Sequence, residues 1–196
     1  MKNEFDFQYI KNLTNEMAKN NLIAYKDLPR YNLFLSQVID FLNDKFEEDN
    51  YTNNIVQNYI KSNVISKPEE GKKKGYSQIH LIQLILLSYM RPILTSVEIK
   101  KVFKLAFNEI NDRTDDIISW ETAYKIFTET QKESYESFLE VSLGNEEKLN
   151  SMIDEFNLND SDKEKIRIFI IVISLIAQAS VIKKLVQRIV NEFNIE

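Results

Sequence analysis

The 196-residue chain has no cysteine, one histidine, three glycines and three prolines. Without cysteine there are no disulfides, thiolate metal sites or thiol nucleophiles, and a single histidine excludes metal sites built on two. Phosphate-binding loops need several closely spaced glycines, which the chain lacks. All-β sandwiches and barrels need a turn about every 8–12 residues, made largely with glycine and proline. The sequence therefore predicts a mainly α-helical protein.

No group of residues has the pattern of a catalytic or metal site. His80 stands in an apolar stretch, as a core histidine does. The acidic stretch that begins at Asp160 faintly resembles a calcium loop, but the required glycine and glutamate positions hold Lys165 and Ile171. We therefore predict a protein that is not an enzyme and that has no catalytic residues, cofactor or metal.

The location of the protein is predicted from its terminus and its most apolar segment. Residues 1–6 are mostly polar or charged, without the apolar core of a signal peptide, which predicts a cytoplasmic protein. The uncharged apolar run Ile168–Ile182 has 15 residues. As a helix this run is about 22 Å long, against about 30 Å for a bilayer core. We therefore expect a buried or subunit-interface helix and no membrane contact.

Charge is unevenly distributed along the chain. The net charge is −5 overall, but residues 51–105 hold 9 basic and 3 acidic side chains. The segments before and after this one carry net charges of −3 and −8. A basic block between two acidic ones suggests a surface that meets an anion, although charge also segregates by chance over short windows.

Hydrophobic periodicity and capping residues predict a series of helices. In the N-terminal half we expect helices over 6–23, from 32 to 46, from a cap at Thr52, from a cap at Ser77 to Pro92, and from Thr95 or Ser96 with Glu98. Residues 65–76 are predicted to be a loop or short hairpin. Further helices are expected over 119–142, 146–156 and 162–193. We divide the chain into an N-terminal helix (1–25), a second unit (26–105) and an all-helical C-terminal unit (106–196).

Between residues 32 and 105, the elements occur in the order of a helix-turn-helix motif followed by a wing. An apolar helix leads through a short turn into an amphipathic helix with an outer face of Asn53, Asn54, Gln57, Asn58 and Lys61. Amide side chains can pair bidentately with adenine in the major groove, and loop lysines attract phosphates of any sequence. An amide-rich face and a lysine loop can also simply be solvated, so the residues alone leave both interpretations open.

A family resemblance favours the first interpretation. The stretch from Leu28 to Phe103 resembles the bacterial domain-of-unknown-function 1836 family. It is also distantly similar to MerR-type winged helices, in Gly75-Tyr76-Ser77 and in residues 94–99. The resemblance implies a transcriptional regulator. The blocks that carry it are 28–29 (LP), 33–38 (LFLSQV), 58–63 (NYIKSN), 72–77 (KKKGYS), 80–81 (HL) and 93–99 (ILTSVEI).

The sequence thus predicts a sequence-specific DNA-binding regulator that contacts double-stranded DNA as a homodimer. The alternative is a protein-interaction adaptor that has the winged-helix shape without binding DNA. Whether the C-terminal unit also binds a small-molecule or protein effector is left open by the sequence. The predicted groove contacts are Asn53, Asn54, Gln57 and Asn58, and the predicted phosphate contacts are Lys61, Lys67, Lys72, Lys73, Lys74, Lys100, Lys101 and Lys104. The predicted dimer interface is Phe169, Ile173, Ile182, Val186, Ile189 and Phe193.

Overall fold

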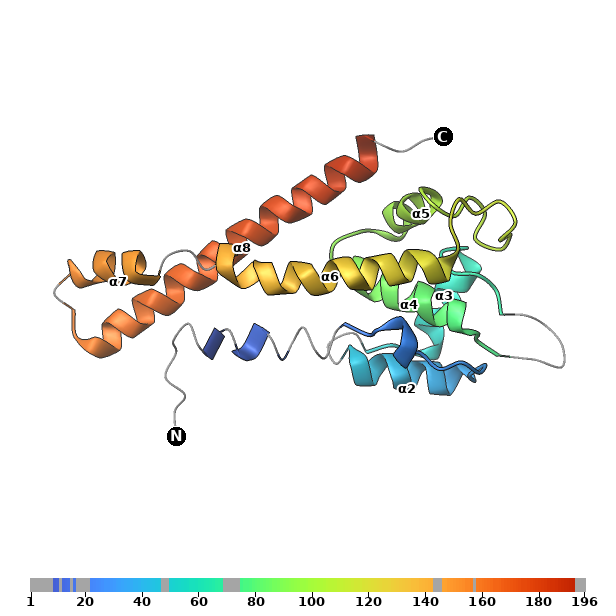
Figure 1. Cartoon of the computed structure of the whole chain (residues 1–196), viewed down its shortest axis with the longest axis horizontal. Coiled ribbons are helices and arrows are strands. Elements are labelled where there is room, and N and C mark those ends of the chain that lie inside the picture. Colours follow the sequence, from blue (N-terminus) through green and yellow to red (C-terminus); the bar gives the residue numbers. More distant parts are fainter. Residues whose placement is uncertain are drawn as a thin grey trace. The chain divides into compact units, whose positions relative to one another are not determined.

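The computed structural model in Figure 1 describes residues 9–10, 12–14, 16, 22–46, 50–68, 75–142, 146–156 and 158–192. Within these residues there is no strand, and the one β pairing is a single antiparallel bridge between Leu33 and Tyr76. The prediction of a mainly helical chain is confirmed. The helices are η1 (Tyr25–Asp27), α2 (Leu35–Lys45), α3 (Asn53–Lys61), α4 (Gln78–Met90), α5 (Ser96–Lys104), α6 (Trp120–Ser142), α7 (Glu146–Asp154) and α8 (Asp160–Glu192).

Several sequence predictions fall outside the described residues. They are most of the helix expected over 6–23, and the individual residues Lys72, Lys73, Lys74 and Phe193.

The chain folds into two compact units. Ile23–Glu129 together with Val186–Glu196 form one, called the core unit below. Met1–Leu22 together with Thr130–Leu185 form the other, called the tail unit. Both α6 and α8 therefore contribute residues to each unit.

Three helices of the core unit, α3, α4 and α5, begin at the capping residues that the sequence predicts. The Thr52 hydroxyl accepts a hydrogen bond from the backbone N–H three residues later, at 3.3 Å. Thr95 and Glu98 form a reciprocal capping box, with N–H to Oγ1 at 3.3 Å and N–H to Oε2 at 2.8 Å. At Ser77 the backbone N–H donates to Nδ1 of His80 at 3.0 Å. These contacts satisfy backbone N–H groups that have no partner within the helix.

The centre of the core unit is α4, which is apolar on nearly every side. Its leucines and isoleucines at 81, 82, 84, 85 and 87 are fully buried, and His80 is buried with them as predicted. Its polar side chains bond to neighbouring segments. The Gln83 Oε1 atom accepts from both the N–H and the hydroxyl of Ser66, each at 2.9 Å.

The core unit continues past residue 105, where the sequence predicted a boundary. Phe107 stacks on Trp120, with ring centroids 3.5 Å apart and planes 11° apart, and Phe103 meets Trp120 edge-on at 5.1 Å. The Tyr124 hydroxyl donates to the carbonyl of Ile23 at 2.7 Å. The start of α6 is thus part of the same hydrophobic core as α5, and the division at 26–105 and 106–196 differs from the compact units of the structure.

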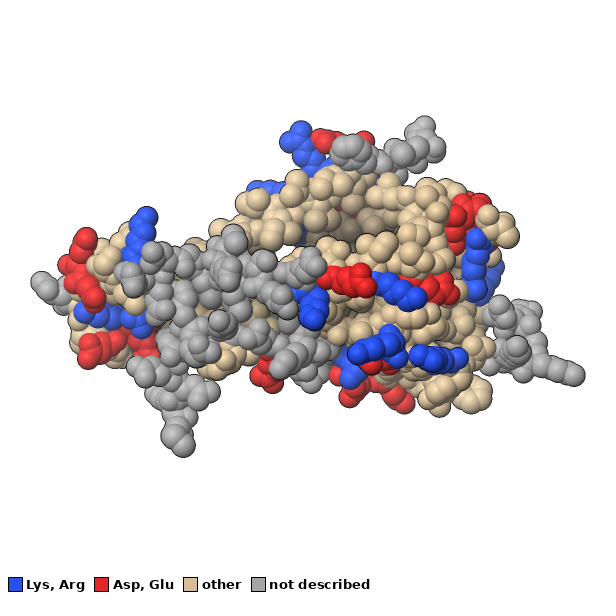
Figure 2. Space-filling view, viewed as in Figure 1, with Lys and Arg blue, Asp and Glu red and all other residues tan. Residues whose placement is uncertain are grey.

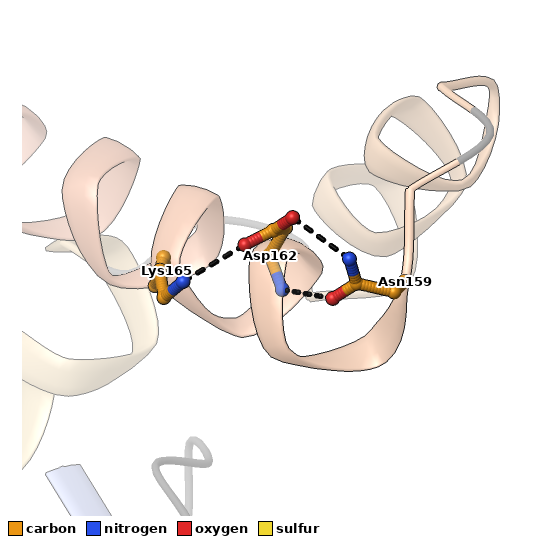
Figure 3. A network of polar contacts seen from close by, with 3 residues as sticks. All are labelled: Asn159, Asp162 and Lys165. Atoms are coloured by element: carbon orange, nitrogen blue, oxygen red, sulfur yellow. Dashed lines mark hydrogen bonds and ion pairs between the residues drawn. The ribbon is translucent and has the colours of Figure 1, made fainter.

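In the tail unit, α8 begins at a small polar network (Figure 3). Asn159 caps the helix: its Oδ1 accepts from the Asp162 N–H at 3.0 Å and its Nδ2 donates to Asp162 Oδ2 at 2.8 Å. Lys165 donates to the other Asp162 oxygen at 2.8 Å. The hydrogen bonds from Lys165 and Asn159 lower the pKa of Asp162. The cap places the first residue of α8 at Asp160, two before the predicted start.

Candidate nucleic-acid interface

The α3 helix separates an apolar face from an amide-rich face. Val56 is fully buried and Ile60 is 7% exposed. Asn53, Asn54 and Asn58 are exposed. The three asparagines that the sequence singled out are thus presented to solvent by a helix whose opposite side is fixed in the core.

The chain immediately before α3 is held in place by Tyr51, a residue that the sequence analysis did not single out. Both backbone polar groups of Tyr51 pair with the side chain of Asn43, at 2.6 and 3.1 Å. Its hydroxyl lies 2.7 Å from the Ser88 hydroxyl in α4, and the Arg91 guanidinium lies 4.8 Å above its ring centroid. These contacts connect α2, the turn and α4, and so set where α3 begins.

Gln57 differs from the other amides of α3 because a second element holds it. Its side chain is half-buried, and its Nε2 donates to the hydroxyl of Tyr76 at 3.2 Å. Tyr76 is itself paired with Leu33 through two backbone hydrogen bonds of 2.8 and 2.9 Å. Burial raises the pKa of the Tyr76 hydroxyl. Tyr76 is therefore a positioning residue that sequence reasoning missed; its place in the Gly75-Tyr76-Ser77 block was the available signal.

Gly75 allows the chain to pass close to the segment before α2. Its φ is +148°, and a Cβ there would lie 2.9 Å from the carbonyl oxygen of Leu33. Any larger residue would push the bridge apart. The bridge holds Tyr76 beside the entry to α2, and in the sequence Gly75 and Tyr76 directly follow the run of three lysines at 72–74.

The remaining predicted phosphate contacts lie on three separate segments. Lys61 is exposed in the last turn of α3, and Lys67 is exposed in the segment after it, where its backbone N–H donates to Asn111 at 2.9 Å. On α5, Lys104 is exposed, whereas Lys100 and Lys101 are half-buried. Figure 2 shows basic and acidic side chains side by side on the face that it displays.

The predicted dimer residues lie on more than one side of α8. Phe169, Ile173, Ile182 and Ile189 are 57%, 48%, 52% and 44% exposed. Ile173 and Ile182 are nine residues apart, which places them on opposite sides of a helix. Val186 is half-buried and packs against the core of its own chain. The structure thus does not bring the predicted interface together on one face.

Helix α8 is long and apolar enough, by length and composition alone, to cross a membrane. Buried core helices often share this property, but 6% of the most apolar 18-residue window of α8 is buried. Most of this window is therefore not covered by the chain itself. Of the two expectations, a buried helix or a subunit-interface helix, the low burial disagrees with the first.

The fold defines a mainly helical protein whose core unit presents an amide-rich helix. A family model described as a domain of unknown function (DUF1836) matches residues 23–127, more than half of the chain. The chain belongs to this family, and the match nearly coincides with the continuous part of the core unit, Ile23–Glu129.

One relative extends the similarity into the tail unit. The uncharacterized protein YkrK of Bacillus subtilis (strain 168) is 30% identical over 179 residues, covering 80% of this chain and 74% of the relative. No solved structure matches the chain.

Proposed function

We propose that the protein is a cytoplasmic, sequence-specific DNA-binding transcriptional regulator. In this proposal α2 and α3 form a helix-turn-helix, followed by a MerR-like wing at residues 65–76. The observation that carries it is the exposed row of amides on α3, a helix with no acidic residue and with its apolar side buried. The major groove of DNA is about 12 Å wide and admits an α-helix.

Four polar residues of α3 have proposed roles that follow from their environments. Asn54 and Asn58 are four residues apart and both exposed, so they share a face that can reach adjacent base pairs. Gln57 lies between them and is oriented by Tyr76, so less side-chain entropy is lost when it pairs with a base. Lys61, one turn further along, is placed to contact a phosphate.

The charge distribution supports the same role. The chain as a whole carries −5, but the segment 51–105 carries a net +6, from 9 basic and 3 acidic residues. The acidic remainder lies on other segments and opposes non-specific association. Contacts from the lysines at 67, 72–74 and on α5 would give affinity without base preference.

Retention of genomic DNA fragments by the purified full-length protein, followed by sequencing, tests the proposal. We expect a shared sequence motif among the retained fragments. Recovery of random fragments only, or of none, would contradict the proposal and favour the adaptor that does not bind DNA.

Variants of the motif-binding protein then identify the reading helix. Asn54→Ala should weaken binding to the motif by about 1–3 kcal/mol while leaving random DNA nearly unchanged. Asn191→Ala is the matched control, because Asn191 is also an exposed helical asparagine but lies on α8. Equal discrimination by both variants would remove α3 from the reading role.

A further inference from the structure

An uncovered apolar strip runs along α8 within the tail unit. We call it the α8 seam: Ile166, Phe169, Ile173 and Ile176, which are 40%, 57%, 48% and 56% exposed. Their spacings of three, four and three residues keep them on one side of the helix, as in a coiled-coil seam. Ile170 and Val172 widen the strip, at 37% and 44% exposed.

In the N-terminal half of α8, the side opposite the seam is already in contact with the tail unit itself. Ile171 is 4% exposed, and the Arg167 Nε donates to Asn150 of α7 at 3.0 Å. Lys163 pairs with Asp154 at the end of α7, at 2.7 Å. The α8 seam therefore faces outward while α8 is fixed by contacts on its inner side.

We propose that the α8 seam pairs with the same seam of a second copy, with the two helices antiparallel about a two-fold axis at the level of Ile171. The spacings of three, four and three residues are the same in both directions along the helix. The antiparallel arrangement therefore sets Ile166 opposite the partner's Ile176 and Phe169 opposite the partner's Ile173. Such an interface is self-complementary, as a two-fold dimer requires.

Charges at the ends of the seam favour the antiparallel direction. In this register Lys183 passes within about one helical turn of the partner's Asp162. A parallel pair would instead place Lys183 and Lys184 next to the same lysines of the partner, and like charges at this distance repel.

The size of the exposed strip fits a second copy. Taking roughly 150–200 Å² for a large apolar side chain, six that are about half exposed offer on the order of 500 Å² per copy. A dimer would cover about 1,000 Å² of apolar surface, and its polar flanks bring the total into the range of specific interfaces, about 1,200–2,000 Å². A patch of this size is at the upper end of what monomers expose.

A lipid surface fits the seam less well. The uncharged run that overlaps the seam includes the polar side chains of Ser174, Gln178 and Ser180, which are costly to bury in hydrocarbon. The proposed pairing of α8 lies in the tail unit and does not rest on DNA binding by the core unit. The dimer and the DNA-binding function are therefore tested independently of each other.

Sedimentation equilibrium of the full chain and two lysine variants tests the interface. Ile176 and Leu185 are both 56% exposed, and they lie nine residues apart, hence on opposite sides of α8. We expect the wild type and Leu185→Lys to have twice the chain mass of 23.1 kDa at micromolar concentration, and Ile176→Lys to have the chain mass. A monomeric wild type, or a dimer broken by Leu185→Lys and not by Ile176→Lys, would overturn the proposal. Circular dichroism checks that both variants remain helical.

Engineered cysteines test the antiparallel direction, because the natural chain has none. Ile166→Cys and Ile176→Cys should crosslink when the two variant proteins are mixed and oxidised, and each alone should not. In an antiparallel pair, like positions lie about 15 Å apart along the axis, whereas a disulfide needs Cα atoms within about 7 Å. Crosslinking of each variant with itself would show a parallel pair and overturn the register.

Flotation with phosphatidylcholine vesicles separates the lipid alternative. We expect the wild type to remain in the protein fraction. Flotation of the wild type that Ile176→Lys abolishes would assign the seam to a membrane surface and overturn the dimer.

Discussion

Removing the Phe107 ring should strongly destabilise the core unit. The Phe107 side chain is 5% exposed and stacks on Trp120 with centroids 3.5 Å apart, so Phe107→Ala leaves a cavity against the indole. Large-to-small substitutions of buried aromatic residues cost about 3–5 kcal/mol. This is a large part of the roughly 5–15 kcal/mol that stabilises a typical domain.

Tryptophan fluorescence during urea unfolding measures this effect directly, because Trp120 is the one tryptophan of the chain and lies in the core unit. With a slope of about 1–3 kcal/mol/M, a loss of about 4 kcal/mol lowers the urea midpoint by roughly 1.3–4 M.

The matched control is Ile117→Ala, which changes a 74% exposed residue in the segment before α6 and should shift stability by less than about 0.5 kcal/mol. A loss below about 1 kcal/mol for Phe107→Ala would refute the conclusion that the core unit extends beyond residue 105.

Three further variants test the core unit and its proposed DNA contacts. Tyr124→Phe removes the 2.7 Å hydrogen bond to a buried carbonyl and should cost about 1–3 kcal/mol in urea unfolding; an unchanged midpoint would contradict this contact. Tyr76→Phe removes the partner of the α3 glutamine, costing about 0.5–1.5 kcal/mol of stability and reducing discrimination between the DNA motif and random DNA, as binding titrations can measure. Changing Lys72, Lys73 and Lys74 together to alanine should weaken binding to motif and random DNA alike. Each lost phosphate contact should flatten the dependence of log K on log salt by about 0.9, and a loss confined to the motif would show base reading instead.

Local sequence determined the helices and the exposed face of α3. Thr52 and the pair Thr95 and Glu98 are capping residues, whose hydrogen bonds reach only three residues along the chain. The four-residue spacing of Val56 and Ile60 fixes which side of α3 enters the core, and so which side carries the amides. These features depend on neighbours in the sequence, which is why the sequence alone predicts them.

Contacts between distant residues decided the limits of the core unit and the environment of each amide. The Tyr124 hydroxyl donates to a carbonyl 101 residues away in the sequence. The hydrophobic periodicity around Tyr124 and around Ile23 does not predict that contact. Gln57 and Asn54 look equivalent on a helical wheel, but a tyrosine 19 residues further on holds only the glutamine.

Tertiary structure also decided which face of α8 is left uncovered. The helix is apolar around most of its circumference, so the sequence assigns interface residues to both sides of it. Contacts with α7 and the burial of Ile171 cover the side of α8 opposite the seam in its N-terminal half, whereas Ile182 and Leu185 further along that side remain exposed. Burial is a property of the packed elements rather than of the helix, because an apolar residue is buried only where another element lies against it.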